Sequence, residues 1–339
     1  MVVGGPHMGS VRGIGSLGFL FFLLIGLLAV QPAFAQSGFS GDADGQVHVW
    51  HVQGNVYMLV GAGANITVQA GQDGVLVVDT GVSDMSQQVL AAIRSISDKP
   101  IRYIINTNAD PDHTGGNLVI AQAGSTIAGG NVVGDIGPSA GDQATVIAFQ
   151  SVLDRMSAPT GEKAPTPQGA WPTDTYTTNE KKLYFNGEPI RIIHIANAHT
   201  DGDSMVFFQK SDVLTAGDIF STTTYPVVEL DKGGTINGLI DGLNRIIYLT
   251  TPITMQEGGT MVIPGHGRES DQSGVKWYQE MVTIIRDRVQ YSIKKGMTLE
   301  QVEQAHLTFD YDPRYGAVEG PWTTKMFVDA VYKSLSEKH

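Results

Sequence analysis

From residue 47 onward, the hydrophobic positions occur in short runs rich in β-branched and aromatic residues. Four such runs precede residue 80, and glycine and asparagine residues lie in the gaps between them. Turn residues of this kind join neighbouring antiparallel strands. The pattern therefore predicts an antiparallel meander of four strands, at residues 48–52, 56–60, 65–68 and 74–79.

The next segment changes from strand spacing to helix spacing. Between residues 83 and 97, apolar residues recur at helical intervals, at Met85, Val89, Leu90, Ile93 and Ile96. Residues 101–105 are apolar except for Arg102, which is typical of a strand that is covered on both faces. A helix and then a buried strand are therefore predicted after the meander.

The second half of the chain repeats this order of strands followed by helices. Apolar runs predict strands at residues 182–185, 190–195, 204–208, 213–214 and 261–263, and a longer pattern predicts a helix at residues 236–249. From Tyr278 to Ile293, apolar positions follow helical spacing up to Gly296, and Thr298 and Gln301 have capping-box spacing. Two such halves around one core predict an α/β (α+β) fold, a four-layer αβ/βα sandwich.

The stretch from Gly130 to Thr173 interrupts this alternation. It is rich in glycine, alanine, proline, threonine and serine, and its one predicted helix lies around Asp142 to Met156. This mixed composition favours a lid or a substrate-side insertion over a linker between domains.

The first 35 residues have the pattern of a signal peptide. Arg12 is the only charged residue before an apolar run from Leu17 to Val30, and Ala33-Phe34-Ala35 has the small-x-small pattern of a cleavage site. The apolar run has 14 residues, fewer than the roughly 20 that span a bilayer. We therefore predict cleavage near Ala35-Gln36, export to the periplasm or the medium, no stable membrane anchor, and a single domain over residues 36–339.

The composition narrows the class of partner. The chain has 22 lysine and arginine residues against 34 aspartate and glutamate residues, a net charge of −12. A nucleic-acid-binding protein needs a basic face, so a neutral or weakly charged small molecule is the expected partner. The chain has no cysteine, which leaves histidine, carboxylate and amide oxygen as metal ligands. The sequence leaves the oligomeric state of the protein open.

The densest polar cluster follows the strand predicted at residues 101–105. Asn108, Asp110 and Asp112 alternate there, His113 comes next, and two glycines follow. Side chains at alternate positions can converge on one point. Further polar clusters follow three other apolar runs, and they contain His199, Asp203, Asp218 and His266.

In this order the clusters resemble the motifs of the metallo-β-lactamase superfamily of metal-dependent hydrolases. Residues 77–81 look like its first motif, and residues 108–113 occupy its His-x-His-x-Asp-His motif. Its third, fourth and fifth motifs correspond to His199, Asp218 and His266. The resemblance implies the four-layer fold and a metal-dependent hydrolase.

By analogy with the family, one metal ion is expected to bind tightly, held by Asp112, His113, Asp218 and His266. Two imidazoles and two carboxylates suit Zn²⁺ or a similar divalent ion. The chain departs from the family at the other site, where Asn108 and Asp110 stand in place of two histidines. With His199 and the shared Asp218, this second set is rich in oxygen, so we expect it to bind zinc weakly and to prefer Fe or Mn.

A metal ion in this position would lower the pKa of bound water to near neutrality and supply hydroxide for attack on an ester, lactone, amide or thioester bond. The catalytic candidates are Asp110, Asp112 and His199, with Asp110 as general base and His199 orienting or protonating the substrate. Asp79 and Asp203 are expected to brace the loops around the ligands rather than to bind the metal ion.

Other interpretations stay open at this point. Asn108, Asp110 and Asp112 could cap the following helix, and the protein could be a non-catalytic member of the fold that binds a ligand or one metal ion. Redox chemistry at one iron ranks last, because the imidazoles that iron would need are replaced. No lysine or arginine lies between Asp218 and Lys232, where family β-lactamases usually carry a cation, and this disfavours a dedicated β-lactamase.

Overall fold

The computed structural model describes residues 1, 44–126, 143–158, 165–255 and 258–336. Apart from Met1, the predicted signal peptide and its cleavage site near Ala35-Gln36 lie outside the described residues. In the described part of the chain, no helix is both long and apolar enough to cross a membrane. The single domain over residues 36–339 stays a prediction.

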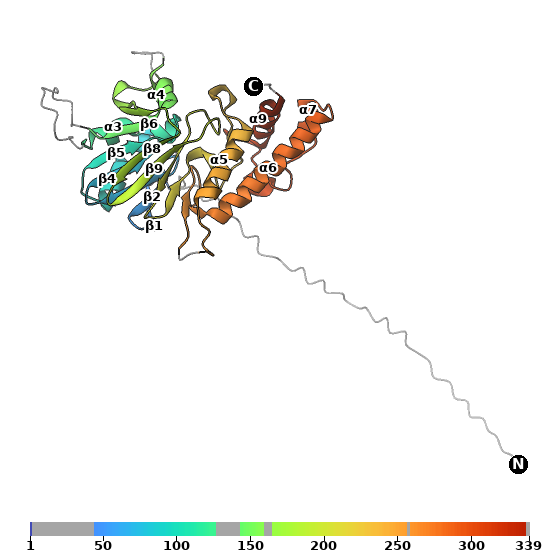
Figure 1. Cartoon of the computed structure of the whole chain (residues 1–339). Helices are drawn as coiled ribbons and strands as arrows, with labels where there is room; N and C mark the ends of the chain where they lie inside the picture. The colour runs from blue at the N-terminus through green and yellow to red at the C-terminus, as the bar shows by residue number, and fades with distance from the viewer. Residues whose placement is uncertain (2–43, 127–142, 159–164, 256–257, 337–339) are drawn as a thin grey trace, which may run out of the picture. The chain divides into compact units, whose positions relative to one another are not determined.

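The first of two sheets has seven strands that follow one another in sequence order (Figure 1). They are β1 (His48–Gln53), β2 (Val56–Val60), β3 (Ile66–Gly71), β4 (Gly74–Val78), β5 (Ile101–Ile105), β6 (Thr145–Phe149) and β7 (Asp174–Tyr176). Strands β1 to β4 pair antiparallel, which confirms the predicted meander. Strands β4 to β7 pair parallel, so their carboxyl ends meet at one edge of the sheet.

The second sheet has six strands in the order β13, β12, β11, β10, β9, β8. They are β8 (Glu180–Phe185), β9 (Glu188–His194), β10 (Ser204–Phe208), β11 (Val213–Thr215), β12 (Met261–Ile263) and β13 (Ser270–Asp271). The pairing is antiparallel except between β11 and β12, which run parallel. The loops that follow β11 and β12 therefore leave the sheet side by side.

Helices lie outside both sheets. They are α1 (Ser86–Ile96), α2 (Pro111–Thr114), α3 (Asn117–Gln122), α4 (Gln150–Ser157), α5 (Ile236–Leu249), α6 (Gln272–Lys294), α7 (Leu299–Gln304), α8 (Asp312–Tyr315) and α9 (Thr324–Ser336). Single 3-10 turns include η1 (Ser83–Met85), η3 (Gln168–Ala170), η4 (Gly217–Ile219) and η5 (Leu230–Lys232). Figure 1 shows α5, α6, α7 and α9, in yellow to red, gathered on one side of the sheets. Thr298 caps α7 in the predicted capping box.

The uninterrupted apolar run of β4 serves two different cores. Val75 and Val77 pack with α1 and α3 on the outer face of the first sheet, while Leu76 and Val78 pack between the two sheets. Successive strand residues point to opposite faces, so a strand that is covered on both sides has no polar position. Continuous hydrophobicity in this strand is thus the result of burial on both faces.

Strand β10 repeats this arrangement in the second sheet. Val206 and Phe208 face the core between the sheets, and Met205 and Phe207 face a core built with α5, α6 and α9. Each sheet is therefore covered by helices on its outer face, and the predicted four-layer α/β arrangement is confirmed.

The segment around residues 143–158 differs from the prediction. A helix is expected around residues 142–156, but Thr145–Phe149 forms strand β6 and the helix begins only at Gln150. Val146, Ile147 and Ala148 are all buried, in three different clusters. Three consecutive buried positions fit a strand that is covered on both faces better than one face of a helix.

The predicted lid or insertion over residues 130–173 is therefore wrong for the residues that the structure describes in it. These residues extend the first sheet as β6 and form α4 beside it. Residues 127–142 and 159–164 lie outside the described residues.

Candidate metal centre

Four of the predicted ligands come together at the carboxyl ends of the strands. His113 Nε2 lies 3.0 Å from Asp218 Oδ2, and His266 Nε2 lies 3.3 Å from Asp112 Oδ2 and 3.4 Å from Asp218 Oδ1. Ligand atoms of Asp112, His113 and His266 all lie within 4.8 Å of one another. We call Asp112, His113, Asp218 and His266 the histidine cluster.

Two buried atoms of the histidine cluster fit a metal ion. His113 Nε2 and Asp218 Oδ1 are both buried, and among the described residues their polar contacts are confined to ion pairs within the cluster itself. Buried polar atoms almost always have a hydrogen-bond partner, and an exception needs an explanation. A nitrogen and a carboxylate oxygen that converge in this way are ligands that a divalent ion such as Zn²⁺ accepts.

Asp79 orients the His113 ring. Its carboxylate accepts hydrogen bonds from His113 Nδ1 at 2.8 Å, from the Thr107 backbone N–H at 2.8 Å and from the Thr107 hydroxyl at 2.7 Å. Asp79 has a φ of 61°, a left-handed conformation that costs free energy for a non-glycine residue. With Nδ1 donating to Asp79, Nε2 is the atom left to face a metal ion. Asp79 thus lies where its predicted bracing role requires.

A close backbone approach fixes His266 beside Asp218. The Gly265 N–H donates to the carbonyls of Gly217 at 2.8 Å and Phe220 at 3.0 Å, which ties the loop after β12 to the loop after β11. A Cβ on Gly265 would overlap Asp218 Oδ1. Glycine is therefore required here because a side chain would displace a ligand.

The charges of the histidine cluster depend on one another. Burial alone would lower the pKa of His113 and of His266, but nearby carboxylates reverse this effect. Asp218 and Asp79 raise the pKa of His113 well above its usual value, and Asp112 and Asp218 raise the pKa of His266 to about 9. Burial would raise the pKa of Asp218, but His113 holds it well below the usual range. Without a metal ion, the carboxylates therefore favour the doubly protonated, positively charged form of both imidazoles.

The other predicted site residues form a different cluster. Asp110 Oδ1 lies 2.6 Å from Lys232 Nζ, and Asp110 Oδ2 lies 3.5 Å from His199 Nε2. Lys232 also forms an ion pair with Glu229. We call Asp110, His199, Glu229 and Lys232 the lysine cluster.

Asn108 lies between the two clusters, and both ends of its amide are in hydrogen bonds. Its Nδ2 donates to Asp218 Oδ2 at 3.1 Å, and its Oδ1 accepts from the Asp110 backbone N–H at 2.9 Å. The second bond is local, but it goes to the N-cap residue of α2, which makes no side-chain capping bond, so the helix-capping interpretation is not confirmed. The amide oxygen that the sequence analysis offers to a metal ion is therefore already engaged.

Asp203 fixes the loop that carries His199. Its carboxylate lies 3.3 Å from His199 Nδ1 and accepts from the Thr200 backbone N–H at 2.6 Å and the Thr200 hydroxyl at 3.1 Å. Burial would lower the pKa of His199, but Asp203, with Asp218 and Asp110, raises it to about 9. Asp203 thus has the position of the predicted bracing residue.

Lys232 and Glu229 do not appear among the residues predicted from the sequence. The sequence analysis considers Lys232 only as the end of a stretch without cations, yet it reaches Asp110 from 122 positions away. Gly233, in a left-handed conformation, ends the turn η5 that carries Lys232. Neither residue belongs to a spacing motif. The Gly233-Gly234 pair next to them indicates a turn in the sequence, but it does not indicate a functional residue.

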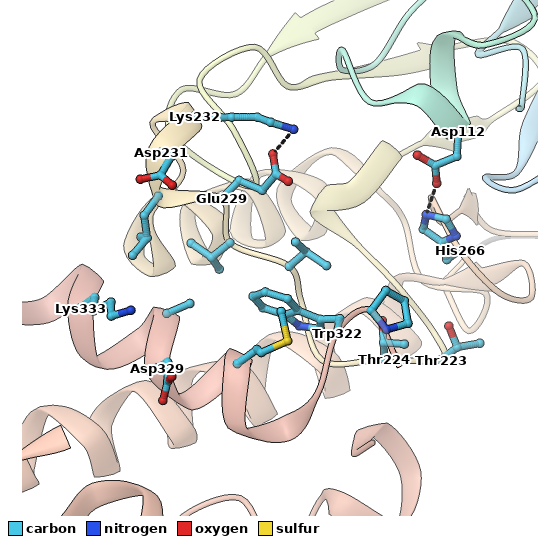
Figure 2. A pocket seen from close by; sticks show the side chains of 16 residues that line it. Asp112, Thr223, Thr224, Glu229, Asp231, Lys232, His266, Trp322, Asp329 and Lys333 are labelled. Carbon is cyan, nitrogen blue, oxygen red and sulfur yellow. Dashed lines mark ion pairs between the residues drawn. The ribbon is translucent and has the colours of Figure 1, made fainter. Parts of the chain in front are cut away.

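A cavity of about 1110 Å³ opens beside both clusters (Figure 2). Asp112 and His266 line one part of it, and Glu229 and Lys232 line another. Its remaining wall includes Val228 and Leu230 from the loop before η5 and Trp322 and Met326 from the C-terminal segment. The cavity thus combines an apolar wall with several charged side chains, and a concave site of this size can hold a small molecule.

The C-terminal wall is anchored to the loop after Asp218. The rings of Phe327 and Tyr225 stack with centroids 4.7 Å apart, and the Tyr225 hydroxyl donates to Asp312 at 2.8 Å. The Tyr278 hydroxyl donates to the Thr224 carbonyl at 3.0 Å. Helices α6 and α9 therefore hold the wall of the cavity in a fixed position next to the ligands.

Comparisons with known proteins give the family and the fold. A family model described as the metallo-beta-lactamase superfamily matches residues 53–268. A linear primary-alkylsulfatase from Pseudomonas sp. is 23% identical over 254 residues, which cover 68% of this chain and 47% of the relative. The chain thus spans about half the length of the curated relative that it matches.

Solved structures show the same fold at low identity. An inverting sec-alkylsulfatase from Pseudomonas sp. has a TM-score of 0.58 and 13% identity, over 85% of this chain and 50% of that one. A metallo-beta-lactamase from Pontibacter korlensis has a TM-score of 0.52 and 14% identity, over 70% of this chain and 99% of that one. At such identities the likeness concerns the fold alone.

Proposed function

We propose that this chain, which belongs to the metallo-beta-lactamase superfamily, is a metal-dependent hydrolase of a small molecule with an apolar group. The observation that carries the proposal is the histidine cluster, where two imidazoles and two carboxylates converge beside a large cavity. Buried His113 Nε2 and Asp218 Oδ1, whose contacts among the described residues are with other members of the cluster, support a metal ion there.

The metal ion of the proposal is zinc, which suits a set of imidazole and carboxylate ligands. When bound, it supplies a Lewis acid and an activated water molecule. Asp79 keeps the His113 ring oriented, and Asp112, His113, Asp218 and His266 hold the ion. His199 orients or protonates the substrate.

Asp110 is the proposed general base, and only one of its oxygens is available for this role. Oδ1 is paired with Lys232, so Oδ2, which faces His199 Nε2 at 3.5 Å, is the atom that accepts the proton. A single accepting atom makes the role sensitive to the position of the Lys232 side chain.

The walls of the cavity support a substrate with an apolar group and an ester, lactone, amide or thioester bond. Trp322, Met326 and Val228 offer an apolar surface next to the histidine cluster. Glu229, Asp231 and Asp329 also line the cavity, and their negative charge disfavours substrates with several negative charges.

A sulfate ester of an apolar alcohol is a second candidate substrate. One relative bears the name of a primary alkylsulfatase, and one similar structure that of a sec-alkylsulfatase. Lys333 lines the cavity together with the apolar residues, whereas Lys232 is already paired with Asp110 and Glu229. Lys333 is therefore the cation that a single negative charge next to an alkyl chain would meet.

Export is a further part of the proposal, since the first 35 residues have the composition of a signal peptide. Expression in a Gram-negative host, followed by fractionation and N-terminal sequencing, tests it. A mature chain that begins at Gln36 in the periplasm or medium supports export, and an intact Met1 in the cytosol contradicts it.

The experiment that tests the activity combines metal content with turnover. The protein is reconstituted with Zn²⁺, its metal content is measured by elemental mass spectrometry, and p-nitrophenyl esters of increasing chain length, lactones, a thioester, nitrocefin and alkyl sulfates are assayed before and after chelation. Turnover that is lost with the metal ion and restored with it supports the proposal. Bound zinc without turnover of any of these substrates leaves a non-catalytic metal-binding protein.

His113→Ala and His48→Ala form a matched pair of variants for this experiment. His113 is buried in the histidine cluster, whereas His48 is exposed and paired with Asp44. We expect only the first variant to lose metal and activity. Equal behaviour of the two variants would place the metal ion elsewhere.

A further inference from the structure

The ammonium group of Lys232 lies where the lysine cluster would otherwise hold a cation. Ligand atoms of Asp110, His199 and Glu229 lie within 4.8 Å of one another, close enough to share one metal ion. Lys232 Nζ forms ion pairs with both carboxylates, at 2.6 Å in the case of Asp110. An ammonium group carries three donors and one positive charge, so it can serve two carboxylates at once.

Asn108 removes a further ligand from the same place. Its amide oxygen accepts from the Asp110 backbone N–H and its amide nitrogen donates to Asp218. A metal ion in the lysine cluster would have to displace an ammonium group, and among the described residues it would find Asp110, His199 and Glu229 as terminal ligands.

We infer that the Lys232 ammonium takes the place of a metal ion in the lysine cluster, so that each chain binds one metal ion, in the histidine cluster. The inference rests on the proposed metal centre. It differs from a weak second site, because it assigns the cation of that site to the protein itself.

The charges of the two clusters support this assignment. In the histidine cluster, Asp112 and Asp218 carry two negative charges that a divalent ion balances. In the lysine cluster, Asp110 and Glu229 carry two, and Lys232 balances one of them within ion-pair distance. A divalent ion added there would repel both the ammonium group and the ion already held across Asp218.

The backbone of Lys232 is held in place, which separates this lysine from an ordinary surface ion pair. Its carbonyl accepts hydrogen bonds from Arg155 Nη2 at 2.8 Å and from the Asp201 backbone N–H at 3.0 Å. Arg155 in turn forms an ion pair with Asp201 at 2.6 Å. The turn η5 is thus fixed against α4, and the side chain begins from a defined point.

The histidine cluster has no comparable cation. Among the described residues, the ion pairs of Asp112 and Asp218 are all with histidines. A metal ion can displace the protons of these imidazoles, but it cannot remove a covalently attached ammonium group in the same way.

Metal stoichiometry tests the inference directly. The wild-type chain, Lys232→Met, Lys232→Arg and Lys333→Met are each saturated with Co²⁺, freed of unbound metal, and analysed by elemental mass spectrometry and by the Co²⁺ absorption spectrum. Methionine keeps most of the length of the side chain without its charge, and arginine keeps the charge. Lys333 lines the same cavity from α9 and controls for the loss of a lysine charge there.

We expect one Co²⁺ per chain in the wild type, in Lys232→Arg and in Lys333→Met, and two in Lys232→Met, with a second absorption band as the second ion binds. Two ions in the wild type, or one ion in Lys232→Met, would overturn the inference while leaving the histidine cluster as a metal centre. No ion in any of the four proteins would overturn the metal centre itself, and with it the proposed function.

Discussion

Asp112 and Asp110, two residues apart on one loop, belong to the histidine cluster and the lysine cluster. The negative charges of the first cluster face histidines, and those of the second face a lysine. His113 is buried, and its Nδ1, the ring nitrogen that points away from the proposed metal ion, is hydrogen-bonded to Asp79. Asp110 is held by a lysine whose side chain is 37% exposed at the cavity. The comparison suggests two ways to balance a carboxylate cluster, by an ion from outside or by a cation of the chain, and on the proposed assignment this difference sets the number of metal ions.

Removing one histidine from each cluster should give the largest contrast. His113→Ala should lose the metal ion, and its turnover should fall to the rate of the chelated protein. His199→Ala should keep one metal ion and lose most of its turnover, because His199 belongs to the lysine cluster. Metal content and kcat/KM of both variants provide the measurement, and loss of the metal ion from both would remove the distinction between the clusters.

The apparent affinity for zinc should depend on pH, because the metal-free histidine cluster binds protons that the metal ion must displace. In the metal-free protein the pKa of His113 is raised well above its usual value and that of His266 to about 9, so a metal ion must displace both protons at pH 7. The apparent zinc affinity should therefore rise with pH, by up to about 100-fold per unit for two protons. Competition with a chromophoric chelator between pH 6 and pH 8 measures this slope.

The stability of the metal-free protein should fall as the pH rises, whereas its apparent zinc affinity rises. A raised histidine pKa contributes stability that is fully present below the usual pKa of about 6.5. This stability is lost as the pH rises toward 9. Thermal unfolding of the chelated protein should thus occur at lower temperature at pH 9 than at pH 6.5. A melting temperature that rises over this interval would show that the imidazoles are not protonated.

The two bracing carboxylates provide a smaller test of the same comparison. Asp79→Ala should weaken zinc binding by about 10- to 100-fold, because the partner that orients a ligating histidine contributes that much. Asp203→Ala should leave zinc affinity unchanged and lower kcat, since Asp203 braces His199. Equal losses of zinc affinity in the two variants would mean that His199 also binds the ion.

The apolar wall should give the smallest effect. Trp322→Ala should raise KM for long-chain esters by roughly tenfold, a loss of about 1.4 kcal/mol of apolar contact, with little change for acetyl esters. Tyr291→Ala, at an exposed position on α6 outside the cavity lining, serves as the control. If Trp322→Ala raised KM equally for short-chain and long-chain esters, the wall would contribute to folding rather than to substrate binding.

Most of the fold could be predicted because buried positions are apolar, so the spacing of apolar residues in the sequence reveals the strands and helices. Strand β12 (Met261–Ile263) and helix α5 (Ile236–Leu249) have the predicted bounds. Strand β6 (Thr145–Phe149) was beyond reach, because its burial depends on neighbours on both faces, and residues 145–156 alone have an acceptable helical pattern.

The ligand positions of the candidate site followed from the ends of the apolar strands, where Asp112, His113, Asp218 and His266 converge in the structure. Lys232 could not be found in this way. It lies 122 positions from Asp110, and its approach depends on how Arg155 and Asp201 hold the turn η5. Contacts that tertiary packing creates between unrelated loops leave no spacing in the sequence.

The placement of Trp322 and Met326 has an evolutionary consequence. The family model ends at residue 268, and within its bounds lies every member of the histidine cluster, whereas these two wall residues come from the chain beyond it. Mutations in the C-terminal segment can therefore alter which molecules enter without disturbing the reactive centre. The reactive centre and the wall that selects the substrate are thus encoded by separable parts of the chain.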